Sequence, residues 1–185
     1  MATDAVRRYR ARMNRRRFLV ASGTAALVMG AGALYWPERW RYIVIHHSAG
    51  TYGTIEFLQR VHRDRQADDP IDAIPYHYVI GNGNGLAMGE VVSDWRKEYN
   101  LWGTHVSAHN PARNFLGIGI CLIGNFDKTD VPAGQFDALV RLTRQLMHRY
   151  TIAAGNVGFH GQIEGESTHC PGSKFPFEAL RQAIA

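Results

Sequence analysis

Apolar and amphipathic stretches alternate along the chain from about residue 42 to its end. Compact runs of β-branched and other apolar residues predict buried strands, of which Tyr42–His46 and Leu116–Gly124 are the clearest. Apolar residues at helical spacing predict helices at Ile55–Ala67, Gln135–Tyr150 and Phe177–Ile184. The body of the chain therefore combines strands with amphipathic helices.

A β-hairpin is predicted between the first two helices. Tyr76–Ile80 has the composition of a strand, the Asn-Gly pairs within Gly81–Gly85 are a turn signal, and a second strand follows near Leu86–Val92. A last short strand is expected at Asn156–His160. Strands that alternate with helices, with one hairpin among them, indicate an α/β fold with a mixed central β-sheet flanked by α-helices.

Residues 1–34 have a different character from the body. Seven arginines against one acidic residue occupy residues 1–17, and sixteen uncharged residues, Phe18–Ala33, follow. This segment has three features that are typical of a twin-arginine export signal. They are paired arginines before two apolar residues, a weakly apolar stretch, and a small-x-small sequence at its end. The alternative is an uncleaved N-terminal anchor. Both interpretations predict an exported protein of the periplasm or cell envelope. The body of the chain, residues 35–185, is predicted to form one domain.

The positive charge of the chain lies in that N-terminal segment. The net charge is +5, but residues 18–185 carry 14 basic and 15 acidic side chains. A body so balanced does not fit a nucleic-acid-wrapping surface, and 2 cysteines cannot form a disulfide framework. We expect no nucleic-acid partner, no stable membrane partner beyond the N-terminal anchor, and a monomer.

Residue types that bind zinc stand at two predicted strand ends and on a turn. His46 ends the first strand, His160 ends the last, and Cys170 follows before Pro-Gly. Two imidazoles and one thiolate suit Zn²⁺, and three protein ligands leave a fourth position for water, whose pKa falls to about 7 there. From spacing alone, hydrogen-bonded histidines and a structural thiol, or a disulfide between Cys170 and Cys121, remain alternatives.

Five sequence blocks occur in an order that strengthens the zinc prediction. The blocks are residues 43–50 (IVIHHSAG), 75–80 (PYHYVI), 103–106 (GTHV), 117–126 (GIGICLIGNF) and 168–172 (THCPG). Over roughly residues 41–172 the chain resembles the type-2 N-acetylmuramoyl-L-alanine amidases, the zinc family that includes amidase-type phage lysozymes and peptidoglycan recognition proteins. One difference is Gly161, which stands where the family usually has Arg or another long polar residue.

The resemblance implies a ligand set and a reaction. His46, His160 and Cys170 would hold the zinc ion, with His169 and His109 as rival nitrogen ligands. The implied activity is hydrolysis of the amide bond between N-acetylmuramic acid and L-alanine, with peptidoglycan or muropeptides as substrate. The alternative is a non-catalytic peptidoglycan-binding module of the recognition-protein type.

The resemblance also assigns catalytic and substrate-binding residues. Tyr76 would position the nucleophile, and Thr168 would help to stabilise the oxyanion. His105 would line the substrate groove, and it is the expected proton donor to the leaving amine, with a water relay or Tyr76 as alternatives. His47, a neighbour of the first ligand, is another expected substrate-binding residue. Apart from the resemblance, Trp102 or Trp95 is expected to stack on a sugar ring.

Overall fold

Five strands form one sheet in the order β3-β2-β4-β1-β5. All neighbouring strands are parallel except β2 and β3, which form the antiparallel hairpin that the sequence predicts. The strands are β1 (Tyr42–His47), β2 (Tyr78–Ile80), β3 (Val91–Ser93), β4 (Gly117–Leu122) and β5 (Val157–Phe159). The mixed α/β fold class is thereby confirmed.

The computed structural model describes residues 36–66 and 73–185. The predicted export signal or anchor, residues 1–34, lies outside these described residues. Contacts divide the chain into two units, Met1–Arg39 and Trp40–Ala185, and the first contains the short 3-10 helix η1 (Trp36–Glu38). Among the described residues, no helix has both the length and the apolar character needed to cross a bilayer.

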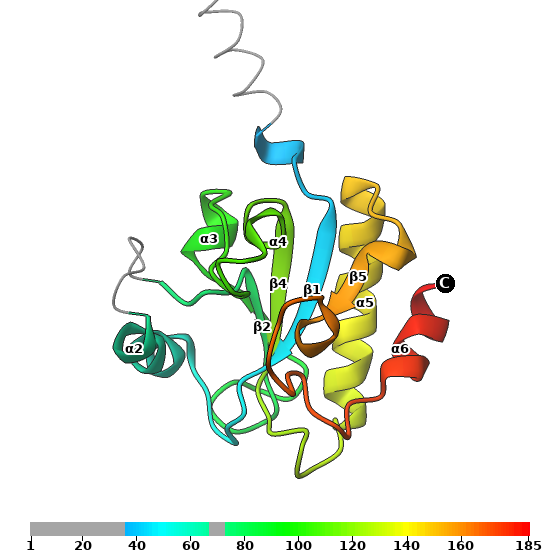
Figure 1. Cartoon of the computed structure of the whole chain (residues 1–185). Coiled ribbons are helices and arrows are strands. Elements are labelled where there is room, and N and C mark those ends of the chain that lie inside the picture. Colours follow the sequence, from blue (N-terminus) through cyan, green and yellow to red (C-terminus); the bar gives the residue numbers. More distant parts are fainter. Residues whose placement is uncertain (1–35, 67–72) are drawn as a thin grey trace, which may run out of the picture. The chain divides into compact units, whose positions relative to one another are not determined.

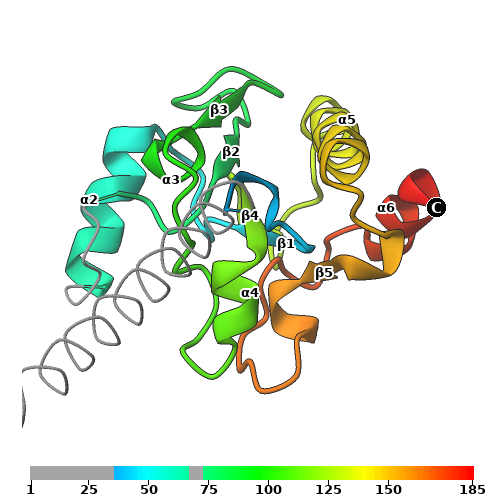
Figure 2. The same cartoon turned by 90° about the horizontal axis from the view of Figure 1, so that it is seen from above.

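Helices cover both faces of the sheet in the second unit. The helices are α2 (Ile55–Arg65), α3 (Trp95–Glu98), α4 (Pro111–Phe115), α5 (Ala133–Tyr150) and α6 (Phe177–Ile184), with 3-10 turns η2 (Ala154–Asn156) and η3 (His160–Gln162). Figures 1 and 2 show α5 and α6 on one side of the sheet and α2 on the other. The three predicted helices are present, whereas the short helices α3 and α4 were not predicted, because four or five residues give too little periodicity.

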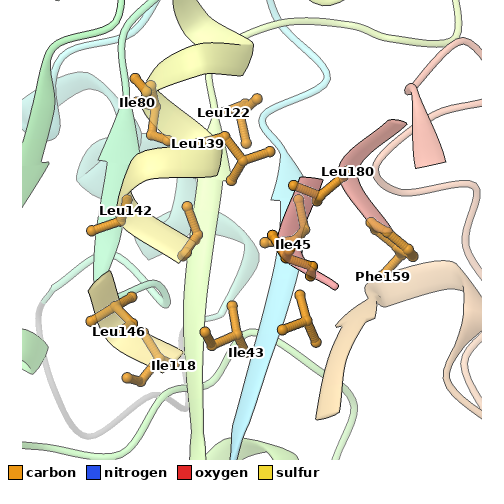
Figure 3. Close-up of a cluster of buried hydrophobic side chains, with 14 of the residues drawn as sticks. Ile43, Ile45, Ile80, Ile118, Leu122, Leu139, Leu142, Leu146, Phe159 and Leu180 are labelled. Carbon is orange, nitrogen blue, oxygen red and sulfur yellow. The ribbon is translucent and has the colours of Figure 1, made fainter. Parts of the chain in front are cut away.

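The larger hydrophobic core lies between the sheet and α5 and α6. Successive residues of a strand point to opposite faces, so Ile43 and Ile45 of β1 face this core, where Leu139 and Leu142 of α5 and Leu180 of α6 pack (Figure 3). Side chains that alternate with these on β1 therefore point to the other face.

A second, smaller cluster lies on that other face, under α2. Thr54 caps α2 by accepting a hydrogen bond from the amide of Phe57, and Leu58 of the helix is buried in the cluster. Tyr76 and Cys121 are buried in the same cluster. Val44 and His46 of β1 point to this face. The imidazole of His46 therefore lies beside the apolar side chains of the smaller cluster.

Candidate metal centre

Three side chains from distant parts of the chain converge at the carboxyl ends of β1 and β5. The Nδ1 atoms of His46 and His160 lie 3.2 Å apart, and the Sγ atom of Cys170 lies 3.7 Å from Nδ1 of His46. All three donor atoms lie within 4.8 Å of one another. His46 and Cys170 are buried and His160 is half-buried, so the cluster is accessible on the side of His160.

Two of the three separations, 3.2 and 3.7 Å, match those of a tetrahedral zinc site, and the third, between His160 and Cys170, is at most 4.8 Å. Zinc binds imidazole nitrogen at about 2.0–2.1 Å and thiolate sulfur at about 2.3 Å. Tetrahedral angles then place two nitrogens about 3.4 Å apart, and a nitrogen and a sulfur about 3.6 Å apart. Two nitrogens and one sulfur are also a donor set that zinc prefers, so the residues present fit a zinc ion with one coordination position left open.

The sheet brings the two histidines together. Strands β1 and β5 are adjacent and parallel, with Ile45 opposite Phe159, so the residues that follow, His46 and His160, lie side by side. His160 is the first residue of the 3-10 turn η3 and not of the strand itself. Neighbouring strand ends thus supply both imidazoles, as the sequence predicted.

Hydrogen bonds to a returning loop place Cys170 beside them. The amide of Gly161 donates to the carbonyl oxygen of Cys170 at 2.6 Å, and the amide of His47 donates to its Sγ atom at 3.3 Å. A Cβ at position 161 would lie 2.2 Å from the carbonyl oxygen of Thr168. This close approach leaves no space for a side chain at position 161. Burial raises the pKa of the Cys170 thiol to about 12, against which the His47 amide acts.

His105 lies behind His46, away from the open side of the cluster. Its Nδ1 atom is 3.2 Å from Nε2 of His46, and its Nε2 atom is 3.4 Å from the carbonyl oxygen of Gly117. The ring packs against Gly119, where a Cβ would lie 2.7 Å from it. Burial lowers the pKa of His105 to about 3. His105 is therefore buried and its ring is neutral near neutral pH, which does not favour the predicted place in the substrate groove or the predicted transfer of a proton to the leaving amine.

Glu166 contacts the outer side of the His160 ring, and no sequence pattern predicts this contact. Nε2 of His160 lies 3.0 Å from a carboxylate oxygen of Glu166. The hydroxyl of Ser107 and the side-chain amide of Asn110 donate to the other oxygen at 2.7 and 2.6 Å. Burial acts to raise the pKa of Glu166, but these hydrogen bonds outweigh it and lower the pKa, so the carboxylate is anionic.

Tyr76 lies against His46 under α2. The two ring centroids are 5.0 Å apart, and His62 of α2 covers the other side of Tyr76 at 5.4 Å. Burial, with the nearby thiols of Cys121 and Cys170, raises the pKa of Tyr76 well above its ordinary value. Its hydroxyl therefore stays protonated near neutral pH.

Thr168 is the other predicted catalytic residue, and it lies on the loop that carries Cys170. Its Oγ1 atom accepts a hydrogen bond from the amide of Cys170 at 3.2 Å, which leaves the hydroxyl hydrogen for another acceptor. Thr168, His169 and Cys170 line a pocket of about 250 Å³. The threonine is thus available on the open side of the loop.

The other predicted substrate-binding residues lie outside the cluster. His47 points to the α5 face, where its Nδ1 atom accepts from the amide of Phe126, since neighbouring strand residues face opposite ways. Trp102 stacks on Phe115, with ring centroids 5.8 Å apart.

The rival ligands and the disulfide alternative are not realised. His109 and His169 are exposed, and the group of His, Cys and acidic side chains close enough to hold a metal ion in residues 36–66 and 73–185 is His46, His160 and Cys170. Cys121 and Cys170 are both free thiols, so the predicted alternative of a disulfide between them is wrong.

Comparisons with known proteins agree with this geometry. A family model described as N-acetylmuramoyl-L-alanine amidase matches residues 36–173. The solved amidase LysC of Clostridium intestinale is 27% identical, with a TM-score of 0.66 over 80% of this chain and 87% of that one. Peptidoglycan-recognition protein SC2 of Drosophila melanogaster is 28% identical over 142 residues, 71% of this chain and 68% of that protein. Drosophila PGRP-LB shares the fold, with a TM-score of 0.56 at 24% identity over 73% of this chain and 76% of that one.

Proposed function

The chain belongs to the N-acetylmuramoyl-L-alanine amidase family, and from this premise we propose that it is a zinc-dependent hydrolase. The bond cleaved is the amide that joins the lactyl group of N-acetylmuramic acid to L-alanine in peptidoglycan. The observation that carries the proposal is the convergence of two imidazole Nδ1 atoms and one thiol sulfur within 4.8 Å. Their separations fit zinc with an open coordination position.

His46, His160 and Cys170 would hold the zinc ion. When bound there, zinc supplies Lewis acidity that activates water near neutral pH and polarises a carbonyl group. The amide of His47, which donates to the sulfur of Cys170 at 3.3 Å, stabilises the thiolate that ligation requires. His46 is buried, so bulk water does not reach its ring.

Tyr76 and Thr168 are the proposed catalytic side chains. The protonated hydroxyl of Tyr76 donates a hydrogen bond that orients the attacking water, and Thr168 donates its hydroxyl hydrogen to the oxygen that becomes negative. A single donor of this kind contributes about 3–4 kcal/mol in other hydrolases. The leaving amine needs a proton, which the attacking water releases on attack. His105 lies buried behind His46 and is not placed to deliver it.

Peptidoglycan or a muropeptide is the proposed partner. A mutant of Drosophila PGRP-LB, which shares the fold, has been solved in complex with tracheal cytotoxin, and a ligand of that kind fits a member of this family. Export directed by residues 1–34 would bring the protein to the cell wall. The recognition-protein relatives support an alternative in which the chain binds peptidoglycan without cleaving it. The complete zinc-ligand set favours hydrolysis.

Mass spectrometry of the products from a defined muropeptide tests the proposal. We expect the full-length protein to hold roughly one zinc ion per chain and to release the free stem peptide with L-alanine at its amino end. Cys170→Ser is expected to lose both properties. His169→Gln, at the neighbouring exposed position, is the matched control and is expected to keep both.

Two outcomes contradict the proposal in different ways. A wild-type protein that binds the muropeptide but releases no peptide supports the binding module. Equal peptide release by the wild type and Cys170→Ser shows that the assigned centre does not perform the reaction.

A further inference from the structure

Both histidines of the candidate centre turn the same ring nitrogen inward. The Nδ1 atoms face each other at 3.2 Å, whereas Nε2 of His46 points to His105 and Nε2 of His160 points to Glu166. An imidazole binds a metal through Nδ1 only when it is neutral and carries its hydrogen on Nε2. The partner of each Nε2 atom therefore decides whether that histidine is ready to bind.

At His46, a backbone carbonyl determines the arrangement of hydrogens. The carbonyl oxygen of Gly117 can only accept, so Nε2 of His105, at 3.4 Å, carries the hydrogen. Nδ1 of the neutral His105 ring is then an acceptor, and Nε2 of His46 donates to it at 3.2 Å. This leaves the lone pair of Nδ1 of His46 turned toward the centre.

At His160, a carboxylate determines which ring nitrogen carries the hydrogen. The oxygen of Glu166 can only accept from Nε2 of His160, at 3.0 Å. Glu166 is itself held by the Ser107 amide and hydroxyl and by the Asn110 side chain. Its orientation is thus set by residues that do not touch the centre, and it remains in place without a metal.

We propose that His105 and Glu166 are positioning residues that hold His46 and His160 with hydrogen on Nε2, so that both Nδ1 lone pairs face the centre before zinc binds. The identity of the metal rests on the proposed function. A hydrogen bond from the outer nitrogen also fixes the orientation of the ring and makes the inner nitrogen a better donor to a metal. The hydrogen bonds from His46 through His105 end on the neutral backbone carbonyl of Gly117, whereas the hydrogen bond from His160 ends on the anionic carboxylate of Glu166.

Zinc affinity of full-length variants, measured by competition with a chelator, tests both chains. His105→Leu and Glu166→Met remove the acceptor, and we expect each to weaken zinc binding by about 10–100-fold. His105→Asn puts an amide oxygen where Nδ1 lay, and Glu166→Gln keeps one acceptor oxygen, so both are expected to recover part of the loss. Glu164→Met alters an exposed side chain of the same loop and is expected to bind zinc as the wild type does.

The nitrogen-15 shifts of the histidine rings give a second readout that does not require catalysis. In the zinc-free wild type, we expect Nε2 of His46 and of His160 to carry the hydrogen. A hydrogen on Nδ1 of either ring overturns the proposal, as does unchanged zinc affinity in Glu166→Met. Equal loss in Glu164→Met and Glu166→Met also overturns it, since the effect would belong to the loop as a whole. A wild type that binds no zinc contradicts the proposed function instead, while the ring shifts still decide this inference.

Discussion

His46 and His160 reach the candidate centre from regions of unlike stability. His46 stands on β1, which hydrogen-bonds to β4 on one side and β5 on the other, and it is 1% exposed. Its support, His105, is packed on Gly119 of β4. His160 begins a 3-10 turn at the surface, and the neighbouring segment that carries Cys170 is held by single hydrogen bonds, such as that from Gly161 to Cys170.

This difference indicates which part of the metal centre is ordered by folding of the chain without a metal ion. A central strand opens only with the whole sheet, whereas a surface loop with few hydrogen bonds opens locally. We therefore regard β1, β4 and His105 as the preformed half of the site. The segment that follows Glu166 and carries Cys170 is the half whose stability depends on the metal.

Removal of zinc should separate the two halves most strongly. We expect a chelator to reduce hydrolysis to background, because the Lewis acid is lost. Hydrogen exchange should rise by about tenfold or more at the amides of Gly161 and Gly172, while amides of β1 and β4 keep their protection. Mass-spectrometric hydrogen exchange with and without zinc measures this. Equal loosening of both regions would contradict the division.

A substitution under His105 should disturb the preformed half. In Gly119→Ala the new Cβ would lie 2.7 Å from the His105 ring. Because ring and strand cannot yield easily, we expect a loss of about 1–3 kcal/mol in the free energy of unfolding, with weaker zinc binding. Gly158→Ala on β5 is the control, since a Cβ there meets nothing within 4 Å. Denaturant titration of both variants measures the free energy of unfolding. Equal stability of the two variants would contradict a tightly packed position of the His105 ring on Gly119.

Acid should lower the free energy of unfolding by a smaller amount, through His62 of α2, which packs against Tyr76. Burial lowers the pKa of His62 to about 4 from an ordinary value of 6.5. The unfolded chain thus gains a proton below pH 6.5 that the folded chain refuses until pH 4, so stability falls over that interval as the pH drops. His62→Gln should remove about 1 kcal/mol of this fall. Unfolding of both proteins from pH 8 to pH 4 measures it, and parallel curves would contradict it.

Much of the fold could be predicted because its signals are local. The apolar run at β1 and the helical periodicity of α5 each specify one element without reference to the rest of the chain. The closing helix begins and ends where the pattern placed it, at Phe177–Ile184. The hairpin strand β3 is shorter than predicted, because only Val91–Ser93 pair with β2.

The site could be predicted only in part, because its supports depend on tertiary contacts. Strand ends indicated His46 and His160, but no local pattern relates Glu166 to Ser107, 59 positions away. The buried position of His105 was not predicted, for a similar reason. Its direction depends on the space that Gly119 leaves on a strand folded beneath it, and sequence spacing does not reveal which face of a sheet a loop covers.

The alternation of side chains along β1 has an evolutionary consequence. Ile43 and Ile45 belong to the larger core, while His46 faces the smaller cluster. Exchange of the histidine would remove the chemistry and spare the packing beneath α5 and α6. Selection can therefore act on the candidate metal centre and on foldability almost independently.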